Sequence, residues 1–140
     1  MSLGIKFFKH SSDEVYVEHL FKASDPIPGE RSFLAVSRID NQENFLNEVY
    51  QGDDDVPLPH NFIIEYTIYN LPRRKKGEVV ARHTMRIDEN GLVTVSSEII
   101  CPEGVRLKGW AGCKFSLAGL EISNDQQQSF SVSCEDYVQP

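Results

Sequence analysis

Side chains that could bind a metal or transfer protons are scattered through this sequence. A zinc site needs ligands at short spacings, and the histidines are far apart: His10, His19, His60 and His83. His83 lies in a run of alternating apolar residues, which favours a structural role over acid–base catalysis. The acidic run Asp53–Asp55 lacks the alternating acidic residues, glycine and distal glutamate of a calcium loop. We therefore predict no metal site and expect the acidic run to form a solvated turn.

Motifs for nucleophilic catalysis or nucleotide binding are also missing. The sequence contains no GxSxG, HExxH, P-loop or GxGxxG element. Cys101, Cys113 and Cys134 form no CxxC pair and are odd in number, which predicts free thiols and a cytoplasmic, reducing setting. The basic run Arg73–Lys76 could bind phosphate or act as a nuclear-localisation signal. Its position between a proline and a glycine favours a solvated loop. We expect no catalytic activity and no cofactor in this domain.

The composition is that of one ordinary globular domain with an acidic surface. The 140 residues are 40% hydrophobic and 25% charged, enough to bury a sizeable core. The net charge of -7 disfavours nucleic acid and anionic lipid as partners, because both attract basic surfaces. No segment reaches the apolar length of a membrane span, and the first residues lack the apolar core of a signal peptide. We expect neither nucleic acid nor membrane among the partners.

A β-hairpin is the clearest local prediction. The segment Arg86–Ser97 reads RIDENGLVTVSS, with Asn90-Gly91 between two alternating apolar runs. This dipeptide favours a tight turn because both residues tolerate positive φ. Ile87 on one side and Val93 on the other indicate strands with one buried face each.

Alternating apolar residues predict strands in most of the remaining chain. The ranges are Glu14–Phe21, Ser32–Ile39, Phe62–Ile68, Val79–Ile87, Lys114–Ser123 and Ser129–Ser133. The best helical candidate, Gln42–Tyr50, is short, and no window is convincingly amphipathic. About eight short strands with regular turn signals favour an all-β fold, an antiparallel β-sandwich. We expect residues 1–125 to form the sandwich and residues 126–140 to form a C-terminal strand or tail.

The hairpin resembles a signature of the substrate-binding domain of 70-kDa heat-shock chaperones, the DnaK family. There it reads Asp-Ile-Asp-x-Asn-Gly-Ile-Leu-x-Val-Ser-Ala. Further matches follow in the family's order and with near-constant spacing, at Ser2–Ile5, Ile27-Pro28, Asp40–Gln42, Val49–Gly52 and Tyr66–Pro72. The resemblance covers most of the chain up to about Ser97. Gly119–Asp125 is similar to the last sandwich strand, displaced by an insertion between Glu98 and Ala118.

This resemblance implies a function in binding polypeptides. The family's sandwich holds an extended hydrophobic segment of an unfolded polypeptide in a channel, with main-chain hydrogen bonds and a central apolar pocket. Co-chaperones are further partners that it implies. ATP binding is expected in a separate ATPase domain of a larger parent protein. The family's helical lid is expected to be absent from this chain, because residues 126–140 are too few and too poor in helix formers to build it.

The resemblance also implies a set of site residues. By alignment, the channel-lining positions hold Ile5, Phe7, Phe8, Val36, Arg38, Phe45, Leu46, Asn47 and Ala81. Phe8 and Arg38 fall where the family places the two sides of an arch over the peptide, so they could meet as cation over ring. Phe45 replaces a small β-branched residue, and its ring could fill the pocket. Asn47 replaces an aliphatic pocket wall, and the small Ala81 leaves room for the Phe45 ring.

These departures, with a connection at Lys9–Val15 that is longer than the family's, leave more than one function open. The favoured hypothesis is a peptide-binding chaperone module without catalysis of its own. The alternative is a sandwich with an occluded channel that acts as a structural or regulatory protein-interaction domain. An unrelated immunoglobulin-like domain would leave the ordered motif series to chance, and an enzyme is the least favoured class.

Overall fold

Alternation of buried and exposed side chains defines the long strands of this protein. In β6 (Val80–Ile87) and β7 (Leu92–Ile100) every second side chain is buried, as expected for strands with one face on a core. The computed structural model describes residues 2–9, 12–100, 106–107, 111–118, 121–130, 132–133 and 137–138. The other strands are β1 (Leu3–Phe8), β2 (Val15–Phe21), β3 (Gly29–Val36), β4 (Asn44–Gln51), β5 (Phe62–Tyr69), β8 (Arg106–Leu107), β9 (Ala111–Ala118), β10 (Glu121–Phe130), β11 (Val132–Ser133) and β12 (Tyr137–Val138).

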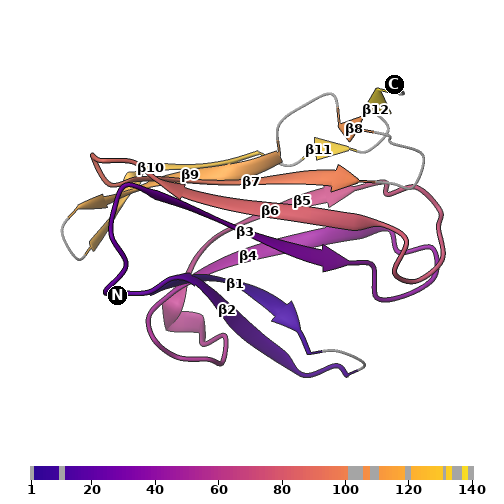
Figure 1. Cartoon of the computed structure of the whole chain (residues 1–140), viewed down its shortest axis with the longest axis horizontal. Coiled ribbons are helices and arrows are strands. Elements are labelled where there is room, and N and C mark those ends of the chain that lie inside the picture. The colour runs from indigo at the N-terminus through magenta and orange to yellow at the C-terminus, as the bar shows by residue number, and fades with distance from the viewer. Residues whose placement is uncertain are drawn as a thin grey trace.

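Two five-stranded sheets pack face to face as a sandwich (Figure 1). One has the order β11-β5-β4-β1-β2, and the other has the order β10-β9-β7-β6-β3. The long strands pair antiparallel, whereas the short β11 pairs parallel with β5, and β12 pairs with β8 in a separate ribbon. The prediction of an all-β sandwich is confirmed. Among the residues described, the only helix is the 3-10 turn η1 (Pro59–Asn61), so none is long and apolar enough to cross a membrane.

The predicted hairpin joins β6 and β7. β6 pairs with β7 from Ile87 opposite Val93 to Val80 opposite Ile100. The predicted tight turn at Asn90-Gly91 is confirmed, and within it only Gly91 has a positive φ, of 80°. The reason is Asp88, whose carboxylate accepts hydrogen bonds from the backbone N–H groups of residues 90 and 92. This arrangement leaves only the glycine in the left-handed region.

Two other expectations are corrected. The helical candidate Gln42–Tyr50 is wrong, because β4 covers most of it and pairs with β1 on one side and β5 on the other. The predicted strand Lys114–Ser123 is divided between β9 and β10, which pair antiparallel with Ala118 opposite Glu121. The apolar positions change phase here, from Phe115 and Leu117 to Leu120 and Ile122, and this change marks the boundary that the prediction of one strand missed.

Some expectations fall outside the described residues. They concern His10, Cys101, Cys134, the residues 119–120 of the expected last strand, and parts of the tail. Cys113 is described and is a buried free thiol. Burial raises its pKa to about 12, so the side chain stays protonated and behaves as a small apolar group in the core.

The acidic run Asp53–Asp55 anchors the segment after β4 to the strands beside it. Asp53 accepts a 2.6 Å hydrogen bond from the Ser2 hydroxyl, and the carbonyl of Asp55 accepts one of 2.8 Å from the N–H of Val17 in β2. The Asp55 carboxylate also lies 3.2 Å from Nε2 of His19. No cluster of metal-binding side chains occurs among the described residues. The acidic run therefore covers part of the β2 edge.

The core between the sheets is mostly apolar and contains one chain of hydrogen bonds. Its members are Leu3, Ile5, Phe21, Phe45, Val49, Tyr66, Ile68, Leu71, Val79, Ala81, Met85, Ile87, Val93, Val95, Ile99, Cys113 and Phe115. The Ser97 hydroxyl lies 2.6 Å from the Tyr66 hydroxyl and 2.6 Å from Nδ1 of His83. All three groups are buried, so each bond replaces water that the core excludes. The structural role expected for His83 fits this position.

Protonation of His83 should weaken the fold in acid. Burial lowers the pKa of His83 from 6.5 to about 4, because the charged ring is disfavoured there. The unfolded chain binds this proton below about pH 6.5, so stability present at neutral pH is lost as the pH falls toward about 4. Between about pH 7 and about pH 5, the wild type should lose about 2 kcal/mol more free energy of unfolding than His83→Asn. Urea unfolding measures both; equal losses would show that this ring does not stay neutral in the fold.

Candidate functional site

An aromatic ring and a guanidinium group join two connections at one end of the sandwich. Phe8 is the last residue of β1, and Arg38 follows the end of β3. The guanidinium carbon of Arg38 lies 3.7 Å from the centre of the Phe8 ring. At this distance the cation is attracted by the face of the ring. The contact expected from the alignment is therefore present.

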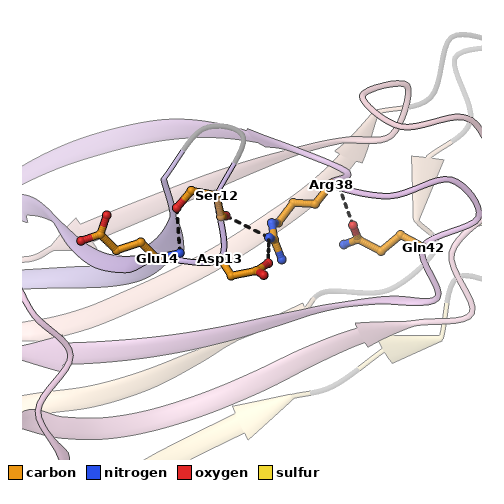
Figure 2. Close-up of polar contacts among 5 residues, drawn as sticks. All are labelled: Ser12, Asp13, Glu14, Arg38 and Gln42. Atoms are coloured by element: carbon orange, nitrogen blue, oxygen red, sulfur yellow. Dashed lines mark hydrogen bonds and ion pairs between the residues drawn. The ribbon is translucent and has the colours of Figure 1, made fainter.

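Arg38 also binds the β1–β2 connection directly (Figure 2). Its Nη2 atom donates to the Ser12 carbonyl at 3.1 Å and lies 3.0 Å from a carboxylate oxygen of Asp13. We refer to Phe8, Ser12, Asp13 and Arg38 as the arch. Because the Asp13 side chain is fully exposed, its ion pair adds little stability by itself. The ring contact and the carbonyl bond are the more protected parts of the arch.

Side-chain hydrogen bonds shape each connection from within. The N–H of Arg38 donates to the Gln42 side-chain oxygen at 2.7 Å, and the Gln42 amide donates to the Asn44 carbonyl at 2.9 Å. Asn41, which lies between Arg38 and Gln42 in the chain, has a φ of 55°, a value that asparagine tolerates better than most residues. In the other connection, the N–H of Glu14 donates to the Ser12 hydroxyl at 2.8 Å (Figure 2). Both ends of the arch are thus held by local bonds.

The basic run Arg73–Lys76 supports the β3–β4 connection. The N–H of Asn41 donates to the Arg74 carbonyl, and the N–H of Lys76 donates to the Asp40 carboxylate, both at 2.8 Å. Just beyond, the N–H of Gly77 donates to the Ser37 carbonyl at 2.9 Å. These contacts use mainly backbone groups of the basic run. They give it a structural role in holding the arch.

A cluster of aromatic rings lies between the sheets next to the arch. The Phe7 ring centre is 4.2 Å from that of Phe33 and 5.7 Å from that of His83, which oppose each other on β3 and β6. Tyr16 approaches Phe7 from β2 at 6.3 Å. Sequence reasoning placed Phe7 at the site but missed Phe33 and His83. Their exact opposition could only be known once the register of β3 against β6 was known.

The other aligned residues divide into a buried and an exposed set. Ile5, Phe45, Asn47 and Ala81 belong to the interior, and Phe45 is only 8% exposed. The side-chain nitrogen of Asn47 is buried without a hydrogen-bond partner among the described residues, which is unfavourable in a core.

The exposed set consists of Phe8, Val36, Arg38 and Leu46, exposed to different degrees. Leu46 lies on the opposite face of β4 from Phe45 and Asn47, because side chains alternate along a strand. The structure therefore brings Phe7, Phe8, Val36 and Arg38 to one end of the sandwich and separates Leu46 from the interior residues.

The arrangement suits binding better than chemistry. Ser97 and His83 form a hydrogen bond of the kind found in nucleophilic sites, but both are buried and Ser97 is shared with Tyr66. At the surface the site offers aromatic and aliphatic side chains and one cation. Such groups bind apolar side chains and leave backbone groups of a ligand free to pair with strand edges.

Comparisons with known proteins agree on one family. A family model described as Hsp70 protein matches residues 1–104, which contain every aligned site residue. The chaperone protein HscA of Buchnera aphidicola subsp. Baizongia pistaciae (strain Bp) is 24% identical over 99 residues. That match covers 71% of this chain and 18% of HscA, so the chain spans less than a fifth of the length of this curated relative.

Replacing Arg38 by alanine should loosen the β1–β2 connection without unfolding the sandwich. The variant loses the ring contact and the bonds to Ser12 and Asp13. Because Arg38 and Phe8 are partly exposed and Asp13 is fully exposed, we expect the free energy of unfolding to fall by at most about 1 kcal/mol. Amide hydrogen exchange over residues 12–15 should become faster, since the connection loses its partner across the arch.

Arg82→Ala is the matched control for this measurement. Arg82 is also an exposed arginine in an ion pair, at 3.7 Å from Glu98, but its side chain lies on the outer face of β6. Its removal should leave exchange over residues 12–15 unchanged. The same exchange rates in both variants would show that the arch does not hold the connection.

Proposed function

The chain belongs to the Hsp70 family, and from this premise we propose that its sandwich is a substrate-binding module that holds extended hydrophobic segments of unfolded polypeptides. ATP binding and hydrolysis would belong to another domain of a larger parent chaperone, and co-chaperones would be further partners. The module itself catalyses no reaction in this proposal, and it works in the cytoplasm.

The observation that carries this proposal is the arch with its apolar surroundings. Phe8 is 41% exposed and Val36 is 51% exposed, although both are large apolar side chains. Clustered exposed apolar groups indicate a surface that another molecule covers. The half-buried Phe7 lies next to them and contacts Phe33 of the facing sheet. A segment that crosses this end would place its apolar side chains on these rings and its main chain along the arch.

A second candidate follows from the filled interior. Phe45 occupies a core position where the resemblance predicts an open pocket, and it is packed with Ile5 and Ala81 in the same apolar cluster. In this alternative the interior accepts no client side chain, and the domain acts as a structural or regulatory protein-interaction module. Binding would then be confined to the surface at the arch or would be absent.

Binding of a labelled, extended, leucine-rich peptide tests the proposed function. Fluorescence anisotropy should show weak binding to the wild type, with a Kd in the range of about 10 μM to about 1 mM. Phe8→Ala should weaken it at least about fivefold, because about 1 kcal/mol of aromatic contact is lost. Phe62→Ala is the control: it removes an aromatic side chain that is also 41% exposed but lies at the other end of the strands, opposite Tyr50 of β4, and it should leave the Kd unchanged. No binding by the wild type would contradict the proposal.

Replacing Phe45 by valine distinguishes the two candidates. If the ring fills the pocket, the smaller side chain should open it and tighten binding of the leucine-rich peptide about tenfold, equivalent to about 1.4 kcal/mol. The void should also lower the free energy of unfolding by about 1–3 kcal/mol. Val49→Ala, a fully buried change on the same face of β4, should lower stability without changing affinity. If Phe45→Val alters neither affinity nor melting temperature, the ring does not occupy the pocket.

A further inference from the structure

Strand β3 is a long edge strand of its sheet. It is the last strand in the order β10-β9-β7-β6-β3, and all of its residues from Gly29 to Val36 pair with β6 on one side. Figure 1 shows it at the border of the layer, next to β6. Edge strands in proteins are usually short, charged or covered, because their free backbone groups can pair with another chain.

The register shows which backbone groups of β3 point outward. The N–H of Asp88 donates to the Leu92 carbonyl, so even-numbered residues of β6 bond toward β7 and odd-numbered ones bond toward β3. On the other side of β6, the N–H of Ser37, just after β3, donates to the carbonyl of Val79, just before β6, so there too odd-numbered residues bond to odd-numbered residues. The odd-numbered residues of β3 therefore face β6. The even-numbered residues direct their N–H and C=O groups away from the sheet.

These outward groups are largely unpaired in the part of the chain that the structure describes. The carbonyl of Glu30 accepts a hydrogen bond from the Arg31 side chain at 3.0 Å. The backbone groups of Ser32, Leu34 and Val36 have no partner on their outward side within that part of the chain. The adjacent edge of the facing sheet differs, because β2 is partly covered by the backbone of Asp55.

The side chains of this edge also favour association. Leu34 is 58% exposed, and Val36 and Ile39 continue the apolar surface beyond it. From Ser32 to Val36 the strand contains no charge and no proline, the residues that usually block edge-to-edge pairing. We refer to Ser32, Leu34 and Val36 as the β3 edge.

We propose that the β3 edge pairs antiparallel with the β3 edge of a second copy of this chain. With Leu34 opposite Leu34 of the second copy, Ser32 is opposite Val36, and every opposed pair joins even-numbered residues whose backbone groups point outward. The same register places Glu30 opposite Arg38, so opposite charges lie at both ends of the strand pair. In this register the outward backbone groups, the apolar side chains and the charged residues of one copy each meet a suitable partner on the other. A second copy is therefore the occupant that fits this edge.

Such a dimer is weak, because a single pair of strands buries less area than a standard protein interface. It forms one continuous sheet from the two copies and uses the other side of β3 from the β6 ladder. Phe8 and Asp13 take no part in its backbone pairing, but Val36 and Arg38 belong both to this strand pair and to the surface proposed above for a peptide. A client segment and a second copy would therefore compete for this end of β3.

Sedimentation velocity of the full chain tests this inference over protein concentrations from about 10 μM to about 1 mM. The weight-average mass should rise from 15.9 kDa toward twice that value. Leu34→Pro removes an outward N–H and leaves the bonds to β6 intact, so it should abolish the rise. Leu34→Lys should also abolish the rise in mass, because it places two lysines opposite each other at the centre of the strand pair. Leu92→Lys changes an exposed leucine on β7, a strand that pairs with β6 on one side and β9 on the other, and should dimerise like the wild type.

Melting temperatures establish that each variant is folded, and Leu34→Lys stands in if Leu34→Pro does not fold. A wild type that stays at 15.9 kDa over the whole range overturns the proposal. So does a dimer that persists in both folded Leu34 variants. If Leu34→Pro instead abolishes binding of the leucine-rich peptide to a monomeric wild type, the edge receives the client and the second copy is not its occupant. Loss of peptide binding in Phe8→Ala with dimerisation intact would leave this inference standing by itself.

Discussion

The register of the β6–β7 hairpin decides how its whole sheet bonds and packs. The backbone bond from Asp88 to Leu92 directs the odd-numbered residues of β6 toward β3. The same residues, among them His83, are the buried ones. A shift of one residue would expose His83 and bury Arg82, because side chains alternate between faces. The polar chain in the core, the ring contact of Phe7 and the unpaired side of β3 all depend on this register.

Stability and ligand binding make opposite demands on the aligned site residues. Phe45 contributes more to the sandwich when its ring is enclosed, whereas a binding pocket needs that space. Phe8 and Val36 remain exposed, which is unfavourable for an isolated domain but gives a partner apolar surface to cover. The buried side-chain nitrogen of Asn47 has no hydrogen-bond partner within the described part of the chain, so core stability does not explain this residue. This division of the aligned residues into a buried and an exposed set favours a binding surface at the arch over a pocket in the interior.

Local signals in the sequence were sufficient where neighbours along the chain determine the structure. Asn90-Gly91 marked the hairpin, but the turn geometry depends on the Asp88 carboxylate, which the dipeptide does not describe. In β4 the inward-facing Asn47 interrupts the apolar alternation, and the pattern therefore resembled a helix. The alignment placed Arg38 over Phe8 correctly. Its bond to Asp13 could not be predicted, because it depends on how a connection folds in three dimensions.

The support of the β3–β4 connection by the basic run has a consequence for how this protein tolerates sequence change. The bonds from Asn41 to Arg74 and from Gly77 to Ser37 join backbone atoms, which every amino acid except proline can supply. Replacement of the basic side chains therefore leaves these bonds in place. Insertion or deletion of one residue between Pro72 and Gly77 would displace them and move Arg38 with its connection. Length, rather than charge, is the property of this loop that the fold constrains.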